Sequence, residues 1–248
     1  MGSISPDALL QSLPANVRRR LEDLVRSLRD TLGDDLDAII AHGSVARGEY
    51  VEGHSDIDLL LVLRRDDREK LEAIGPALKV ASYSARIEAI LLASAEIPNA
   101  ADVFPLLFGD IRGSHALLHG RDPFASLVIP AAHVRIRIEQ ELRDARIRLR
   151  RVVTEAAGDP ALLVGPVERK LKQIRSPLRA LLRLRGEEVD EKLESVLRAA
   201  CAAYGLDPEP LLHLSGSLDK THDVLRNLLD AAIEDVDARG AENDGDKT

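Results

Sequence analysis

The chain has 248 residues, which is long enough for one large domain or two modest ones. Its net charge is -8 and its sequence pI is near 5.4, and this acidic balance does not indicate non-specific binding to nucleic acid. Its single cysteine, Cys201, excludes an internal disulfide and a zinc site built from cysteine pairs. Residues 1–20 lack the apolar core of a signal peptide, and no uninterrupted apolar run reaches the roughly 18 residues of a membrane span, so we expect a cytoplasmic protein.

The first half of the chain alternates between strand-like and helix-like segments. Short apolar runs bounded by turn residues predict strands at Leu36–His42, Asp56–Leu63 and Arg86–Leu92. Apolar residues spaced by three and four predict helices at Asn16–Leu32 and Arg68–Lys79. Because strands and helices alternate, we expect an α/β (α+β) domain around a small mixed sheet, covering residues 1–128.

The second half of the chain carries no strand signal. Long amphipathic segments rich in leucine and alanine, separated by Gly/Pro breaks, predict a bundle of four or five helices. The clearest of these helices are expected at Val134–Ala157, Val167–Arg185, Val189–Tyr204 and Leu218–Ala238. We therefore expect an all-α helical bundle over residues 129–240, followed by a disordered polar tail at 241–248.

A glycine-containing turn follows the first predicted strand, in the segment His42-Gly43-Ser44. Glycine at this position lets the backbone come close to a ligand that a Cβ atom would keep away. If Ser44 opens a short helix, its backbone N–H groups and hydroxyl converge on one point, which suits a phosphate. Gly48 can then end that helix and return the chain to the next strand.

Two carboxylates, Asp56 and Asp58, stand at the start of the next predicted strand. Residues at i and i+2 of a strand share a face, so both side chains are expected to project the same way. They would repel each other unless a cation joined them, and Mg²⁺ held by one or two carboxylates and substrate phosphates is the expected solution. The alternative is a pair of solvated acids at the start of a strand.

These residues resemble the signature of the nucleotidyltransferase superfamily that includes polymerase beta. The matching pattern is Gly43-Ser44-x-Ala46-Arg47-Gly48 followed by Ser55-Asp56-x-Asp58-Leu59, and it looks most like the branch of aminoglycoside adenylyltransferases and minimal nucleotidyltransferases. The resemblance implies that Gly43, Ser44 and Arg47 bind a nucleoside triphosphate and that Asp56 and Asp58 are catalytic metal ligands.

The resemblance also implies a third carboxylate on a following strand, and Glu88 fits that place. Much of the family has Asp there, whereas Glu looks like the streptomycin/spectinomycin-type adenylyltransferases, in which it is read as the base that activates the acceptor hydroxyl. Glu88 is thus expected to be a catalytic base first and a metal ligand second. The alternative is an edge strand with Glu88 facing water.

The predicted helical half carries a basic stripe at helical spacing: Lys172, Arg175, Arg179 and Arg183. In adenylyltransferases with this layout, cationic residues of the helical domain reach the triphosphate, so Lys172 and Arg175 are expected to bind the nucleotide. The alternative is a solvated polar face opposite the core face of the same helix.

We therefore expect a Mg²⁺-dependent nucleotidyltransferase that moves AMP from ATP to a hydroxyl of a small molecule and releases pyrophosphate. An aminoglycoside is one such acceptor, and the acceptor is expected in the cleft between the two domains. The sequence does not distinguish a monomer from a homodimer, and neither a nucleic acid nor a membrane is an expected partner.

Three alternatives stay open. The chain could be an antitoxin-type nucleotidyltransferase that adenylylates a protein, although its own helical half is unusual for that class. The bundle could be a HEPN-like module that binds RNA, but it lacks the Arg-x4–6-His motif and stacking aromatics. It could also be a non-catalytic nucleotide-binding regulatory module, which would not need three acids.

Overall fold

The computed structural model describes residues 4–159, 162–214 and 218–245. These residues divide into two compact units between Ile129 and Pro130, next to the expected domain boundary. Within the described part of the chain, no helix combines the length and the apolar character needed to cross a membrane.

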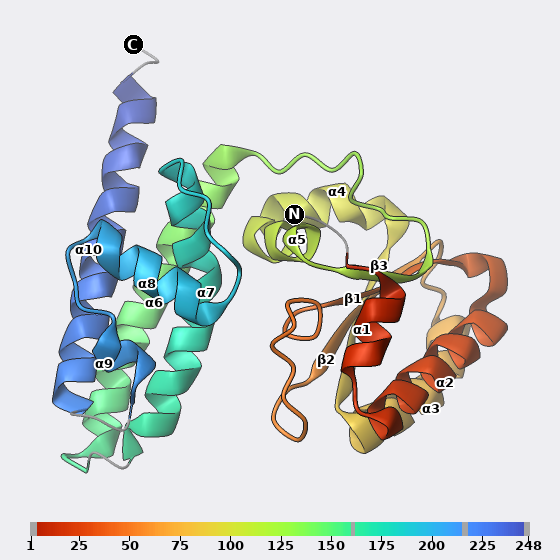
Figure 1. Ribbon diagram of the computed structural model, residues 1–248. Helices are drawn as coiled ribbons and strands as arrows, with labels where there is room; N and C mark the ends of the chain where they lie inside the picture. The colour runs from red at the N-terminus through yellow and green to blue at the C-terminus, as the bar shows by residue number, and fades with distance from the viewer. Residues whose placement is uncertain (1–3, 160–161, 215–217, 246–248) are drawn as a thin grey trace. The chain divides into compact units, whose positions relative to one another are not determined.

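A four-stranded mixed sheet organises the first unit (Figure 1). Its strands are β1 (Leu36–His42), β2 (Ile57–Leu63), β3 (Ile87–Ala93) and β4 (Ala116–Gly120), in the spatial order β3-β2-β1-β4. Strand β1 pairs antiparallel with β2 and β4, whereas β2 and β3 are parallel. The three predicted strands and the mixed α/β class are confirmed, and β4 is a strand that the sequence pattern did not indicate.

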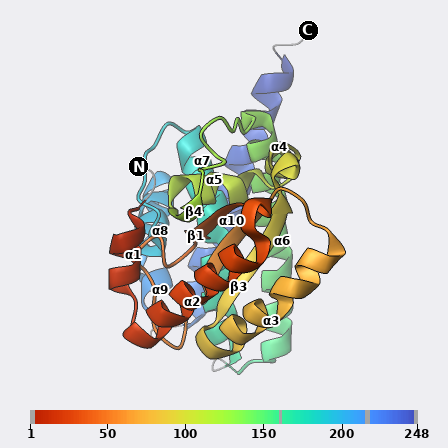
Figure 2. The ribbon, with the colours of Figure 1, turned by 90° about the vertical axis from the view of Figure 1, so that its right-hand side faces the viewer.

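Helices cover both faces of this sheet. The helices α1 (Pro6–Ser12), α2 (Ala15–Leu32) and α3 (Arg68–Ala85) pack on one face, as Figure 2 shows for α2 and α3. The short helices α4 (Ile97–Val103) and α5 (Pro105–Gly113) cover the other face. The 3-10 turns η1 (Gly33–Asp35) and η2 (Ser94–Glu96) precede β1 and follow β3.

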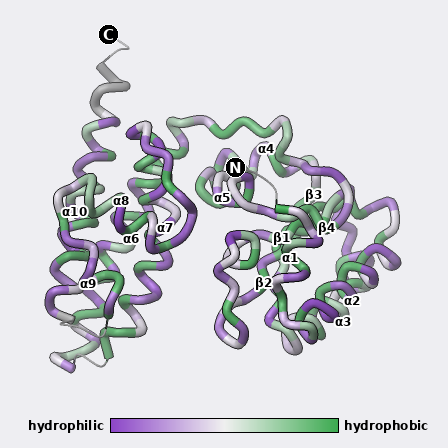
Figure 3. The backbone as a smooth tube through the Cα atoms, viewed as in Figure 1, coloured by the Kyte–Doolittle hydropathy of each residue, from purple (hydrophilic) through white to green (hydrophobic). Residues whose placement is uncertain are grey.

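The sheet therefore has two cores, one on each side. Ile39 and Leu61 pack with α2 and α3, whereas their chain neighbours Ile40 and Leu60 pack with α4 and α5. A strand buried on both faces is apolar at nearly every position, and Figure 3 shows hydrophobic residues concentrated on the strands. The even-numbered residues of β2 and β3 consequently face α4 and α5, which decides where the acidic side chains point.

The second unit is all helical, as expected. It contains α6 (Ala131–Ala156), α7 (Val164–Leu184), α8 (Leu193–Ala203), α9 (Glu209–Leu212) and α10 (Leu218–Gly245). The long helices α6, α7 and α10 run side by side and alternate between hydrophobic and hydrophilic residues (Figures 1 and 3). The tail expected to be disordered, 241–248, is helical as far as Gly245, and residues 246–248 lie outside the described residues.

Candidate active site

The turn after β1 is shaped by Gly43, whose φ of 73° lies in the left-handed region that favours glycine. A Cβ atom at this position would overlap the carboxylate of Asp58. The Asp58 side chain therefore packs directly against the Gly43 backbone. Because both strain and lack of space exclude a side chain, the glycine brings the turn and the acid into contact.

The segment 43–48 forms hydrogen-bonded turns and not the short helix that the sequence suggested. Its backbone bonds run from Arg47 N–H to the Gly43 carbonyl (3.2 Å) and from Glu49 N–H to the Ser44 carbonyl (2.9 Å). The N–H groups of residues 44–46 donate to none of the described residues. Successive unpaired N–H groups in a tight turn form a concave anion-binding surface, so the turn keeps the property that the helix was meant to supply.

Three polar side chains stand in a row across the sheet at the end where β1 stops. In the strand register His42 lies opposite Asp58, and Asp58 lies beside Glu88 on the parallel strand β3. Cross-strand neighbours share a face, here the face covered by α4 and α5. Glu88 is exposed and sits on the edge strand. It therefore lies beside Asp58, as the site hypothesis expects, and also at the edge of the sheet, as the alternative expects.

Burial and neighbouring negative charge act together on Asp58. They raise its pKa from the usual 3.8 to about 6: burial is the largest cause, the charges of Asp56 and Glu88 add to it, and Arg47 opposes it. Burial also lowers the pKa of His42 to about 4, with the positive charge of Arg47 adding to the effect. His42 is therefore neutral near pH 7, whereas Asp58 carries a charge that its surroundings compensate only in part.

Asp56 does not follow the strand geometry expected of it. Strand β2 begins at Ile57, and the Asp56 carboxylate is bound to Arg86, with 2.7 Å between Arg86 Nη2 and Asp56 Oδ1. Arg86 is a non-glycine residue with a φ of 52° at the end of α3. Arg86 was not among the predicted site residues, although it lies only two residues before Glu88 in the sequence.

Arg47 lies among these groups but is already engaged, because its Nε donates to Glu49 Oε2 at 2.8 Å. The turn is further fixed by Ser114 at the end of α5, whose Oγ donates to the Ala46 carbonyl at 2.9 Å. The structure thus brings the predicted Gly43, Ser44, Arg47, Asp56, Asp58 and Glu88 together at one end of the sheet.

The two residues of the second unit that are predicted to bind the nucleotide differ in their surroundings. Lys172 is exposed and forms an ion pair with Glu168 at 3.1 Å. Arg175 is buried and its Nη1 donates to the Glu191 carbonyl at 3.1 Å. Arg179, one turn later, is also buried and bound to the Glu191 carboxylate at 2.5 Å. Half of the basic stripe therefore ties the segment around Glu191 to α7, and a role of Lys172 and Arg175 in nucleotide binding stays a prediction.

The carboxylates fit a magnesium ion in their chemistry. Among the described residues, no group of three or more His, Cys, Asp or Glu side chains is arranged to hold a metal. Mg²⁺ does not need such a cage, because it is usually held by one or two carboxylates and substrate phosphates. Asp58 and Glu88 are adjacent, and the raised pKa of Asp58 marks a negative charge that a cation would compensate.

Known proteins are similar to the first unit in sequence and to the chain in fold. The family model of the nucleotidyltransferase domain matches residues 21–109, a span that contains these acids. A chain of Methanocaldococcus jannaschii named "Putative protein adenylyltransferase" is 32% identical over 109 residues, which are 42% of this chain and 72% of that relative. A similar fold is found in the crystal structure of spectinomycin adenyltransferase AAD(9) from Enterococcus faecialis with ATP and spectinomycin. The match has a TM-score of 0.51 and covers 88% of this chain and 98% of that chain. At 14% sequence identity it is a likeness of fold alone. The chain therefore belongs to the nucleotidyltransferase superfamily and is an enzyme of the adenylyltransferase type.

Proposed function

We propose that the enzyme transfers AMP from ATP to a hydroxyl group of a small molecule, that Asp56 and Asp58 hold the Mg²⁺ it needs, and that Glu88 is a base first and a metal ligand second. The observation that carries this proposal is the row of Asp58 and Glu88 directly beside the Gly43 turn with its unpaired N–H groups. Carboxylates next to an anion-binding turn suit a substrate that arrives as a complex of a triphosphate with a cation.

The turn would bind the β- and γ-phosphates through the N–H groups of residues 44–46 and the Ser44 hydroxyl. Arg47 adds positive charge close to Asp58, as its effect on the pKa of that acid indicates. When bound, Mg²⁺ neutralises charge on the phosphate oxygens. The protein's own contribution is to position the triphosphate, which is the main requirement of phosphoryl and nucleotidyl transfer.

Glu88 would take the proton of the acceptor hydroxyl. That oxygen attacks the α-phosphorus, the bond to the β-phosphate oxygen breaks, and pyrophosphate leaves with the electron pair. Glu88 suits this role because it is exposed on the edge strand, where an acceptor can reach it, and because it lies beside Asp58. A general base must reach the proton that it removes.

An aminoglycoside is our first candidate for the acceptor. It rests on the Glu at position 88, which resembles the streptomycin/spectinomycin-type enzymes, and on the fold shared with the spectinomycin enzyme over both units. A protein acceptor is the second candidate, favoured by the 32% identity to the M. jannaschii relative. That relative matches only 42% of this chain, whereas the fold of the spectinomycin enzyme matches 88%.

The test is incubation with α-³²P-labelled ATP and Mg²⁺ in the presence of spectinomycin, streptomycin and other aminoglycosides, and separately of a protein mixture. We expect a labelled small molecule and one pyrophosphate per transfer, both lost in Asp58→Asn and retained in the exposed-loop control Asp66→Asn. Label in protein bands would favour the second candidate. Binding of ATP with no pyrophosphate release under any condition would refute the proposed function and favour a regulatory module.

A further inference from the structure

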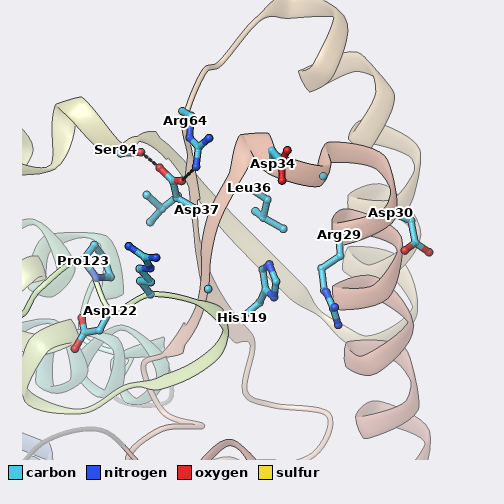
Figure 4. A pocket seen from close by; sticks show the side chains of 14 residues that line it. Arg29, Asp30, Asp34, Leu36, Asp37, Arg64, Ser94, His119, Asp122 and Pro123 are labelled. Atoms are coloured by element: carbon cyan, nitrogen blue, oxygen red, sulfur yellow. Dashed lines mark hydrogen bonds and ion pairs between the residues drawn. The ribbon is translucent and has the colours of Figure 1, made fainter.

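A cavity lies at the opposite end of the sheet from the carboxylates. Its volume is about 720 Å³, within the range of small-molecule sites. It is lined by the start of β1, the end of β2, the residues around the ends of β3 and β4, and the last turn of α2 (Figure 4). At about 3.3 Å per residue, Asp37 at the cavity lies roughly 17 Å along β1 from His42 at the active site. The two sites are therefore separate.

Four basic side chains line this cavity: Arg29 of α2, Arg64 just after β2, His119 of β4 and Arg121 just after β4. Figure 4 shows Arg29 and His119 next to each other on one wall. Neither Arg29 nor Arg121 has an ion-pair or side-chain hydrogen-bond partner among the described residues. Burial lowers the pKa of His119, with Arg29 adding to the effect, so the ring is close to that guanidinium. The cavity thus contains two guanidinium groups that form no ion pair with the described residues.

Two local features of β4 place His119 and Arg121 at the cavity. The register between β1 and β4 shifts, so that His119 lies opposite Ile39, a residue whose side chain packs on the α2 face. Gly120 has a φ of 83°, and a Cβ atom there would overlap the backbone carbonyl of Asp37. The chain therefore approaches β1 closely at this point, and the following residue, Arg121, is brought to the rim of the cavity.

Four acidic side chains, Asp30, Asp34, Asp37 and Asp122, line the same cavity, and none of them forms an ion pair with Arg29 or Arg121. Asp37 accepts hydrogen bonds from Arg64 Nη2 (3.1 Å) and from the Ser94 hydroxyl. Asp122 Oδ1 accepts from the Phe124 N–H at 2.8 Å. The side chain of Asp30 points away from Arg29 and His119 in Figure 4. Arg64 is therefore paired with Asp37, whereas the guanidinium groups of Arg29 and Arg121 can bind a ligand.

We propose that this cavity binds a small organic phosphate, with its phosphate group held by Arg29, Arg121 and His119. Guanidinium groups donate two parallel hydrogen bonds to a phosphate, and donors from two different elements can surround its oxygens. Pro123, which is half-buried, lines the same cavity and offers an apolar contact to the organic part of the ligand. This second site does not depend on the acceptor or on the chemistry proposed for the active site.

The experiment is a titration of the full-length, ¹⁵N-labelled protein with glucose 6-phosphate and, in parallel, with glucose, followed by NMR. Gly33 and Gly120 line the cavity and report on it, whereas Gly43 and Gly48 report on the active site. We expect saturable shifts of the first pair of amide signals with glucose 6-phosphate and none with glucose. The double variant Arg29→Ala/Arg121→Ala should weaken binding at least about tenfold, because it removes two charged donors.

The matched control is Arg26→Ala, which removes an exposed arginine one turn earlier on the same helix, paired with Asp23. It should leave the affinity unchanged. Shifts confined to Gly43 and Gly48 would overturn the proposal, because they would place the phosphate in the active site. Equal binding by the double variant and the wild type, or equal shifts with glucose, would overturn it as well.

Discussion

Replacing Asp58 by Asn should stabilise the metal-free protein while abolishing its nucleotidyltransferase activity. The pKa of Asp58 rises from 3.8 to about 6 in the folded protein, chiefly through burial. Two pKa units correspond to at most about 3 kcal/mol of destabilisation by the charged form. The side chain is partly accessible, and solvent screening reduces this to about 1–2 kcal/mol. An amide of the same shape removes the charge and therefore this cost.

The sign of the pH dependence follows from the direction of the shift. A carboxyl group with a raised pKa takes up its proton in the folded state before it does in the unfolded state. The destabilisation by the charged Asp58 side chain therefore has its full value above about pH 7, and it disappears as the pH falls through 6 toward 4. The advantage of Asp58→Asn should be largest at pH 8 and close to zero near pH 4.

The assay is differential scanning calorimetry in EDTA at several pH values, with Asp66→Asn as a control for the loss of one exposed negative charge. We expect Asp58→Asn to unfold about 3–6 °C above the wild type at pH 8. With Mg²⁺ and ATP at 100 times the dissociation constant, the wild type should gain about 2.7 kcal/mol and the variant nothing. A variant less stable than the wild type in EDTA at pH 8, or an advantage independent of pH, would refute the reasoning.

Three further substitutions test the packing around the site and in the bundle. Gly43→Ala should lower the free energy of unfolding by more than Gly48→Ala does, and it should also abolish activity. Both glycines have a positive φ, but only Gly43 leaves no room for a Cβ atom. Gly48→Ala should lower the free energy of unfolding by about 1 kcal/mol in a urea titration. Arg179→Met leaves its buried carboxylate partner unpaired and should cost about 3–5 kcal/mol, whereas the exposed Arg183→Met on the same helix should change little. Arg86→Ala frees the carboxylate that it holds and should tighten Mn²⁺ binding severalfold in an EPR titration; unchanged affinity would show that this ion pair does not compete with the metal.

The central strands were the most predictable part of the fold. The predicted Leu36–His42 coincides with β1, and β2 begins one residue after the predicted start. Both strands are buried on two faces, so their apolar runs are long and their turn residues mark the ends. The strand β4 was missed because it is short, lies at an edge, and contains His119 and Gly120 among few apolar residues.

Some parts of the site could be predicted because their conformation is set by neighbouring residues in the chain. The Gly43 turn is of this kind, because its conformation depends on residues 43–48. The basic stripe is not: helical spacing places Arg175 and Arg179 on one face, but Glu191, which binds both, lies in a segment outside that helix. The Asp56–Arg86 pair likewise joins residues 30 positions apart. Such contacts follow from packing, which a periodic pattern does not contain.

Glu88 shows how topology makes a distant residue predictable. The parallel pairing of β2 and β3 places the start of one strand beside the start of the other, so an acid near the start of each strand becomes a neighbour. An antiparallel hairpin would have put the start of β3 beside the end of β2, roughly 17–20 Å from Asp58 along a strand of this length. Parallel strands need a crossover, and α3 supplies it between them. The sequence indicated Glu88 through the family resemblance, and α3 is the element that makes the parallel pairing, and with it the proximity of Glu88 to Asp58, possible.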